Sequence, residues 1–327
     1  ITGPTRQEGF FKRFVTGKKP EFIPVPIHSY RFVDDRIVVM EYSKYPEDRF
    51  YSEYILADVC FPVDLNSYVY ANGKYHINAA DSEQQYAGRI EDLRERVIEN
   101  RLVRKTFLLG TDRFGRDMLS RMILGTRVSL AVGFIAVLIS VVIGILLGGI
   151  AGYFRGWIDQ LIMWLVNVVW SVPTLLMVIS ITLVLGKGYW QVFIAVGLTM
   201  WVEVARVVRG QVLSVREKEY VEAARVIGMR PGRILFQHII PNVLSPVVII
   251  SAANFATAIL LEAGLSFLGI GVQPPIPSWG GMIKEHYGYI IVELGYLAFI
   301  PGIAIMLMVL AFTLVGNGLR DALDSRG

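Results

Sequence analysis

The sequence predicts a polytopic membrane protein whose membrane part is all α-helical and follows a soluble α+β segment. Hydrophobic residues make up 54% of the 327 residues, and the mean hydropathy is +0.49. Charge is unevenly divided, because residues 1–105 carry 16 Lys/Arg and 16 Asp/Glu whereas residues 106–327 contain long uncharged runs. We therefore expect a soluble segment over residues 1–105 and a transmembrane domain over residues 106–327.

The composition excludes several function classes. The net charge of +4 is small and no basic patch gathers on the soluble segment, so nucleic acid is not an expected partner. Cys60 is the only cysteine and the four histidines are scattered, which predicts neither a disulfide nor a metal site. No nucleophile–base pair is recognisable, so we do not expect an enzyme.

Five uncharged stretches predict transmembrane helices, each of which needs about 20 apolar residues. The third stretch has only 15 residues and spans only if its helix continues beyond Glu203 and Arg206. Glu203, Glu262 and Glu293 are at or near predicted span ends, where we expect interfacial positions. The five predicted spans are residues 128–154, 160–186, 188–202, 239–261 and 294–319.

The distribution of basic residues orients these spans. Residues 206–238 carry seven Lys/Arg, more than any other loop between spans, which predicts a cytoplasmic location. Counting spans from this loop makes residues 1–120 extracytoplasmic. An extracytoplasmic domain at the start suggests the hypothesis that a further span precedes residue 1.

Small and polar residues recur inside the predicted spans. Gly148 and Gly152 form a GxxxG pair, which we interpret as packing within one bundle rather than as a dimer motif. Polar residues in spans either line a path or bond neighbouring helices, and we favour bonding between helices for most. These residues are Asn167, Ser171, Ser180, Thr182, Thr199, Ser251, Asn254 and Thr257.

The soluble segment has strand and helix signals. Asp34-Asp35 predicts a turn into a strand that ends near Tyr42, and Asn72-Gly73 predicts a hairpin. Residues 80–101 predict a charged helix capped by Asp81 or Ser82. Nine of the fifteen tyrosines precede residue 90, and ordinary strand positions are favoured over a recognition surface. The predicted apolar face of the helix consists of Ile90, Leu93, Val97 and Ile98.

Residues 206–242 contain the most informative motif. Residues 220–242 read YVEAARVIGMRPGRILFQHIIPN. This predicts a short amphipathic helix, a glycine break, and a second helix from near Pro231 to Pro241. A small-residue surface edged by a charge suits docking of a partner protein, and the alternative is a connector that lies on the membrane. The motif residues are Glu222, Ala223, Ala224, Gly228, Pro241 and Asn242.

This pattern resembles the EAA loop of bacterial ATP-binding-cassette (ABC) import permeases. The resemblance implies that Glu222, Ala223, Ala224 and Gly228 form a coupling helix that docks in a cleft of the ATPase subunit. Two further stretches, residues 109–130 and 260–280, look like the C-type permease subunit of dipeptide, oligopeptide and nickel importers. The resemblance covers about residues 107–325, and residues 1–105 depart from it.

The resemblance implies an ABC type I importer-like fold in a bacterial inner membrane. The implied partners are a homologous second permease, one or two ABC ATPases, an extracytoplasmic substrate-binding protein and membrane lipid. ATP and magnesium would be bound by the ATPases, with no cofactor in this chain. The implied cargo is a di- or oligopeptide, with nickel or another small solute as the alternative. A rival from another class is a membrane-anchored sensor or assembly protein that uses the Tyr-rich segment.

A second motif precedes the first predicted span. Its glycine spacing matches a phosphate-binding loop, but Arg116 and Asp117 replace the Lys and Ser/Thr that this loop needs, so we do not expect nucleotide binding. We predict instead an extracytoplasmic polar elbow, fixed by ion pairs among Asp112, Arg113, Arg116, Asp117 and Arg121. The elbow residues are Gly110, Asp112, Gly115, Arg116 and Asp117.

Overall fold

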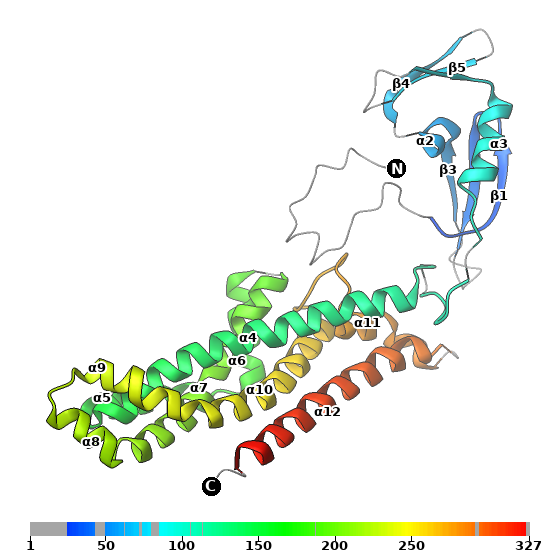
Figure 1. Cartoon of the computed structure of the whole chain (residues 1–327). Coiled ribbons are helices and arrows are strands. Elements are labelled where there is room, and N and C mark those ends of the chain that lie inside the picture. Colours follow the sequence, from blue (N-terminus) through cyan, green and yellow to red (C-terminus); the bar gives the residue numbers. More distant parts are fainter. Residues whose placement is uncertain are drawn as a thin grey trace. The chain divides into compact units, whose positions relative to one another are not determined.

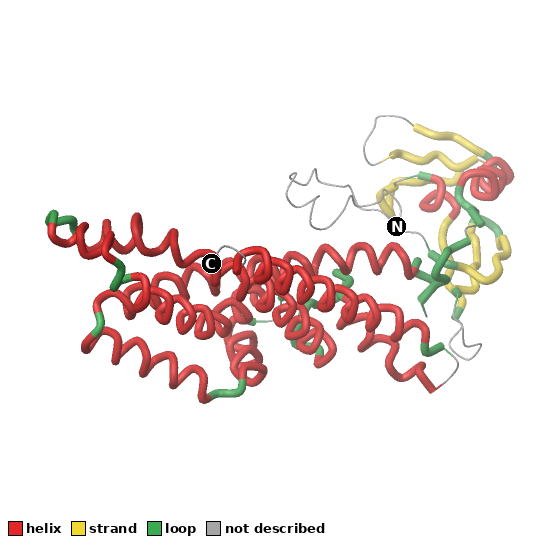
Figure 2. The backbone as a smooth tube through the Cα atoms, turned by 60° about the horizontal axis from the view of Figure 1, so that its bottom comes forward, coloured by secondary structure: helices red, strands yellow, loops and turns green. Residues whose placement is uncertain are grey.

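The computed structural model describes residues 25–42, 50–61, 63–71, 74–79, 85–104, 106–112, 114–186, 188–291 and 294–324. The chain divides into two compact units, Ile1–Arg121 and Met122–Gly327. Strands are found in the first unit, and helices dominate the second (Figure 2).

The first unit contains two antiparallel three-stranded sheets, with strand orders β1-β2-β3 and β4-β5-β6. Its apolar core includes Ile37, Val39, Leu56 and Val97. The elements are β1 (Ile27–Val33), β2 (Arg36–Glu41), β3 (Tyr51–Ile55), α2 (Leu56–Cys60), β4 (Val63–Ala71), β5 (Lys74–Ala79), β6 (Gln85–Gly88) and α3 (Ile90–Asn100).

The two turns predicted in this unit agree with its observed strand pairing. The turn at Asp34-Asp35 joins β1 to β2, and Asp34 takes a φ of 48°. The strands on either side of Asn72-Gly73 pair antiparallel, with Ala71 opposite Lys74, and the two turn residues lie outside the described residues.

The predicted helix over residues 80–101 is wrong in its first part. Residues Gln85–Gly88 form β6 and pair with β5, and α3 begins only at Ile90 after the cap residue Arg89. Gly88 disfavours a helix, and pairing with β5 provides hydrogen-bond partners for the backbone N–H and C=O groups of this segment instead. The expected caps Asp81 and Ser82 lie outside the described residues.

The apolar face of α3 is narrower than predicted. Leu93 and Val97 are buried and Ile90 packs beside them, as predicted. Ile98 is 48% exposed, which contradicts its expected place on the buried face. Residues 93 and 97 are four apart and share one side of the helix, whereas residue 98 is turned away from it.

The second unit is a helical bundle, with α4 leading into it from the last residues of the first unit. Helix α10 packs along both α7 and α12 (Figure 1). The helices are α4 (Met118–Phe154), α5 (Gly156–Ser171), α6 (Thr174–Leu185), α7 (Tyr189–Val215), α8 (Glu219–Val226), α9 (Pro231–Arg233), the π-helix η2 (Ile234–Ile239), α10 (Ile240–Leu268), α11 (Trp279–His286), the 3₁₀-helix η3 (Tyr287–Ile291) and α12 (Tyr296–Asp324).

Four helices of the described chain are long and apolar enough to cross a membrane. They contain the predicted spans 128–154 and 239–261, and the predicted span 294–319 from Tyr296 onward. The short predicted span over residues 188–202 continues past Glu203 and Arg206 to Val215, as its length required.

The predicted span over residues 160–186 is wrong as a single helix. It is divided into α5 and α6, which meet at an angle of 93°. The break falls at Val172 and Pro173, and Val172 has an extended backbone with φ −91° and ψ 129°. A residue before proline avoids helical geometry and proline has no N–H to donate, which explains the break at this place.

The most buried spanning helix, α7, lies close to a glycine stripe on α4. An added Cβ on Gly144 would lie 2.5 Å from Cβ of Val204, and one on Gly148 would collide with the carbonyl oxygen of Ala205. An added Cβ on Gly152 would lie 2.8 Å from Cβ of Val212. Gly148 and Gly152 therefore pack within the chain, which confirms the single-bundle interpretation.

We predict that Gly148→Ala destabilises the second unit by about 1–3 kcal/mol, the usual cost of overpacking a close contact. Gly302→Ala in α12 is the matched control, because nothing lies within 4 Å of a Cβ there. All six tryptophans fall between residues 157 and 279, so tryptophan fluorescence during heating reports on this unit. Equal unfolding midpoints for the two variants would contradict the close contact.

Candidate functional site

The loop between α7 and α10 presents one face of a short helix. In α8, Val221 is fully buried and Ala224 is 6% exposed, and both pack in a cluster with Tyr153. Glu222 and Ala223 are exposed. Since the buried residues are three apart, they hold one side of α8 against the bundle and leave the other as a fixed surface.

Gly228 ends α8 in a hydrogen-bonded cap. Its N–H donates to the carbonyl of Arg225 at 2.9 Å, and the N–H of Met229 donates to Ala224 at 3.1 Å. This pair of bonds is the Schellman motif. Gly228 takes a φ of +82°, which residues with a Cβ adopt only with strain. The loop therefore needs glycine here for its backbone conformation.

Two apolar side chains next to this cap are almost fully exposed. Val226 is 83% exposed and Ile227 is 80% exposed. Burying a side chain of this size stabilises a contact by about 1.5–3 kcal/mol. The exposed surface of the loop therefore offers small, charged and apolar groups side by side.

The second helix of the motif begins at Pro231, as predicted, but its predicted end at Pro241 is wrong. The chain passes through the π-helix Ile234–Ile239 and continues without a break into α10. The wider π-turn ends just before Pro241. This widening accommodates the proline ring, which has no N–H to donate to the preceding turn. Asn242 donates its side-chain amide to the carbonyl of His238 at 2.6 Å, within the same helix.

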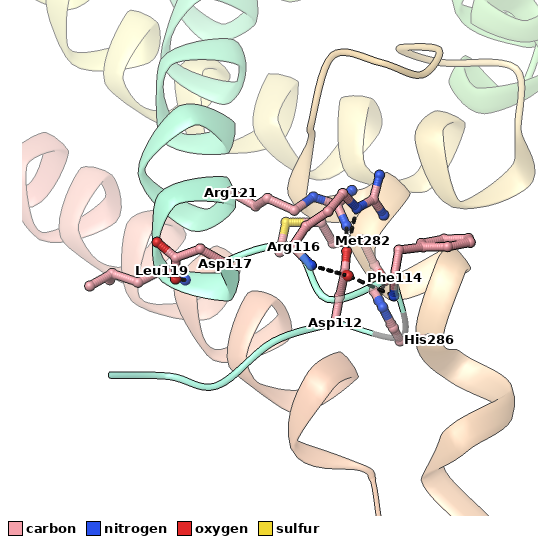
Figure 3. Close-up of polar contacts among 8 residues, drawn as sticks. All are labelled: Asp112, Phe114, Arg116, Asp117, Leu119, Arg121, Met282 and His286. Atoms are coloured by element: carbon pink, nitrogen blue, oxygen red, sulfur yellow. Dashed lines mark hydrogen bonds and ion pairs between the residues drawn. The ribbon is translucent and has the colours of Figure 1, made fainter. Parts of the chain in front are cut away.

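The elbow residues lie together around the carboxylate of Asp112. Figure 3 shows this carboxylate accepting hydrogen bonds from the backbone N–H groups of Phe114 and Arg116, both at 2.9 Å. It also pairs with the side chains of Arg116 and Arg121, each at 2.6 Å. The amides that a phosphate-binding loop would offer to an anion are thus already bonded to the chain's own carboxylate. The expected partner Arg113 lies outside the described residues.

The remaining elbow residues shape the loop. Gly110 and Gly115 have φ values of +69° and +70°, and a Cβ on Gly115 would lie 2.5 Å from Pro26. Asp117 precedes α4 and caps it, because its carboxylate accepts from the N–H groups of Leu119 and Ser120 at 3.1 and 3.3 Å.

The Asp112 carboxyl is acidic despite its burial. Burial raises its pKa. The hydrogen bond from the Arg116 amide and the charges of Arg116 and Arg121 lower the pKa, and together they outweigh the effect of burial. The pKa therefore lies below its ordinary value of 3.8. A lowered pKa means that the ionised form stabilises the fold, and this stability is lost as the pH falls through the folded-state value.

Comparison with known proteins places the chain in a transport family. The sequence model of the family described as "Binding-protein-dependent transport system inner membrane component" matches residues 144–326. The chain belongs to this family. It is therefore a permease subunit of a binding-protein-dependent ABC importer, and it carries the motif loop described above.

Two relatives resemble this permease closely in sequence. The glutathione transport system permease protein GsiD of Pectobacterium atrosepticum is 42% identical over 218 residues, which are 67% of this chain and 72% of the relative. The dipeptide transport system permease protein DppC of Alkalihalophilus pseudofirmus is 43% identical over 217 residues, 66% of this chain and 71% of the relative.

A solved structure shares the fold of the permease. The inward-facing MetNI methionine ABC transporter superposes with a TM-score of 0.52 at 18% identity, and the match covers 62% of this chain and 97% of that one. The likeness supports the mostly helical importer-permease fold.

Two carboxylates of the permease lie within long helices that continue beyond them. They are Glu203 in α7 and Glu262 in α10, and the interfacial position expected for each stays a prediction. Glu262 is fully buried and accepts from the hydroxyls of Ser266 at 2.7 Å and Ser129 at 3.4 Å. Glu293 lies outside the described residues.

The prediction that most polar residues in the spans bond neighbouring helices is wrong. Their hydroxyls donate to carbonyls three or four residues earlier in the same helix, which are the nearest acceptors. Asn167 alone of this set bonds another helix among the described contacts, accepting from Arg206 at 3.0 Å. The hydroxyls bonded to their own helix are Ser171, Ser180, Thr182, Thr199, Ser251 and Thr257.

We predict that Asp112→Asn at neutral pH costs about 3 kcal/mol, because two arginines lose the charge that compensates their own. The buried Cys60 lies in the same unit, so its reaction with a maleimide dye during heating reports unfolding. The wild type should approach the variant's lower midpoint only in acid, as the pH falls below the ordinary value of 3.8.

Asp117→Asn is the matched control for this experiment. Asn caps helices about as well as Asp, so we expect a change of less than about 0.5 kcal/mol. Equal losses for Asp112→Asn and Asp117→Asn would contradict the central role of the Asp112 carboxylate.

Proposed function

We propose that the chain is the permease subunit of a peptide importer and that residues 206–242 are its ATPase docking loop. The observation that carries the docking role is the fixed, exposed surface of α8, capped by Gly228 at a positive φ. Glu222 and Ala223 contact the ATPase in this proposal, while Ala224 holds α8 to the bundle. Pro241 and Asn242 continue the loop into α10.

Peptides are the cargo that the relatives favour. GsiD and DppC are named for glutathione and dipeptide transport, and both cargoes are short peptides. Nickel or another small solute is the alternative within the same machinery. In this proposal an extracytoplasmic binding protein delivers the peptide to a pathway formed with a homologous second permease.

In this proposal, separate ATPase subunits supply the energy for transport. One or two ABC ATPases bind ATP and magnesium, and their closure moves α8 as a rigid element. The spans then alternate between inward- and outward-open states. The permease does no chemistry of its own in this cycle.

We further propose the location of each part. The second unit lies in a bacterial inner membrane with five spans, the fifth formed by the bent pair α5 and α6, and lipid surrounds it. The seven basic residues in residues 206–238 support a cytoplasmic docking loop. Residues 1–120, which include an α+β segment over residues 1–105, are then extracytoplasmic, and the elbow lies on that side.

The test is purification of the tagged protein in mild detergent, with mass spectrometry of the proteins that accompany it. Recovery of a second permease and an ABC ATPase supports the proposal. A sensor or assembly protein that acts through the Tyr-rich segment would purify without an ATPase, and that outcome would overturn it.

We predict that Gly228→Val releases the ATPase and lowers ATP-dependent peptide uptake about tenfold, although the protein still inserts. A residue with a Cβ in the left-handed region costs about 1–2 kcal/mol, which is roughly a tenfold shift in an equilibrium. Gly302→Val is the control, because Gly302 lies in helix α12, outside the docking loop, with nothing within 4 Å of a Cβ.

The control variant should change uptake by no more than roughly twofold, as surface substitutions usually do. Immunoblots of the membrane fraction confirm equal abundance of the two variants. Normal uptake by Gly228→Val at normal abundance would refute the docking role of this loop.

A further inference from the structure

A pocket opens at the break between α5 and α6. It has a volume of about 120 Å³ and is bounded by residues of α5, α6, α7 and α10. Much of its wall is apolar, including Met177, Met200 and Leu261. Its polar side chains are Thr174, Thr199, Glu203 and Thr257.

Glu203 is the only charged residue on this wall, and it lies deep in a spanning helix. It is the fifteenth of the 27 residues of α7, about 21 Å along the axis from the first residue. It is exposed, and the described residues offer it neither a hydrogen bond nor an ion pair. A charged side chain at this depth costs about 3 kcal/mol or more in lipid, so such residues face a polar pathway or a charged partner.

The hydroxyls beside Glu203 present acceptors to the pocket. Thr199 donates to the carbonyl of Val196 at 2.8 Å, and Thr257 donates to Ala253 at 3.1 Å. A hydroxyl has one hydrogen, so both oxygens have only lone pairs left to offer. Together with the carboxylate they form a set of three acceptors, which suits a ligand rich in N–H groups.

The nearest cation on α7, Arg206, is engaged with α5. It donates to Asn167 at 3.0 Å and lies over the ring of Trp170, which lines the pocket. It makes no ion pair with Glu203 among the described residues. The break itself places the carbonyl end of α5 and the amide end of α6 together, so their opposite dipoles largely cancel. Glu203 is the charged side chain that lines the pocket, and its charge favours a cationic ligand.

We propose that this pocket binds the terminal ammonium group of the transported peptide, with Glu203 as its counter-ion and Thr199 and Thr257 as further acceptors. An ammonium group has three donors and one positive charge, which match the carboxylate and two hydroxyl oxygens. The inference rests on the proposed peptide cargo. It assigns to the permease itself a recognition step that follows delivery by the binding protein.

The first test is uptake by the complete transporter in proteoliposomes, with its binding protein and alanyl-alanine as the probe. We expect Glu203→Gln to lower the maximal rate about tenfold, the usual range for losing a charged hydrogen bond, and to raise the ATP hydrolysed per peptide. Glu203→Asp keeps the charge and should restore most of the rate. The affinity of the binding protein for the probe should stay unchanged.

The hydroxyls are tested with a matched pair of variants. Thr257 and Thr313 are both exposed and both donate to a carbonyl four residues earlier, but only Thr257 lines the pocket. Thr257→Val should lower the uptake rate a few-fold, about the effect of one neutral hydrogen bond, and Thr313→Val should leave it unchanged.

A second measurement removes the binding protein altogether. Equilibrium binding to the purified transporter is compared for alanyl-alanine and for propionyl-alanine, which has a hydrogen in place of the amine. The wild type should prefer alanyl-alanine, and Glu203→Gln should bind both alike. A preference that survives in Glu203→Gln would overturn the inference.

The outcomes separate this inference from the proposed function. If the wild type takes up no alanyl-alanine in an ATP-dependent way, the peptide function itself is refuted. If the wild type transports and Glu203→Gln matches it, only the ammonium site is refuted. If Glu203→Gln loses the second permease during purification, Glu203 is a subunit contact and the inference is also overturned.

Discussion

The close contact between α4 and α7 sets the geometry of the second unit. In lipid, apolar side chains gain little by moving from acyl chains to protein, so helices associate where their backbones approach closely. Gly144, Gly148 and Gly152 allow this approach along α4. With α4 on one side and α10 on another, α7 becomes the most buried spanning helix. Both the pocket and the docking loop depend on its position.

Helix α7 connects the docking loop, which follows its C-terminal end, to the pocket, which lies beside its middle. Its C-terminal end leads directly into α8, and Glu203 lies near its centre. Arg209 pairs with Asp159 at 2.5 Å and so fixes the first turn of α5 to α7. In the proposed mechanism, a movement of the docking loop displaces the pocket walls and α5 together.

A second connection runs through α10. The helical segment from Pro231 to Leu268 is continuous, and it carries Thr257 and Leu261 to the pocket. The π-turn at Ile234–Ile239 and the internal Pro246 are its weak points, since each removes a regular hydrogen bond. In the proposed mechanism the ATPase moves the start of this helix, and these points determine where it bends.

The sequence predicts what depends on local patterns. Long apolar runs predict α4, α10 and α12 because a spanning helix needs only length and hydropathy. The spacing around Gly228 predicts the helix and its break, since a positive φ favours glycine. The angle at Pro173 escapes this reasoning, because proline either kinks or ends a helix and the packed neighbours decide which. The place of Glu203 on the wall of a pocket also escapes it, because that wall is assembled from four helices that are far apart in the sequence.

Three carboxylates show how differently the surroundings within one chain can treat one chemical group. Asp112 receives two backbone amides and two guanidinium groups, and it fixes its loop. Glu262 receives hydroxyls of Ser129 and Ser266 and ties α4 to α10. Each of these two carboxylates is satisfied by hydrogen-bond donors of the chain itself. Glu203 has no such partner among the described residues. Because an unsatisfied charge at that depth is costly, binding of a cationic ligand stabilises it.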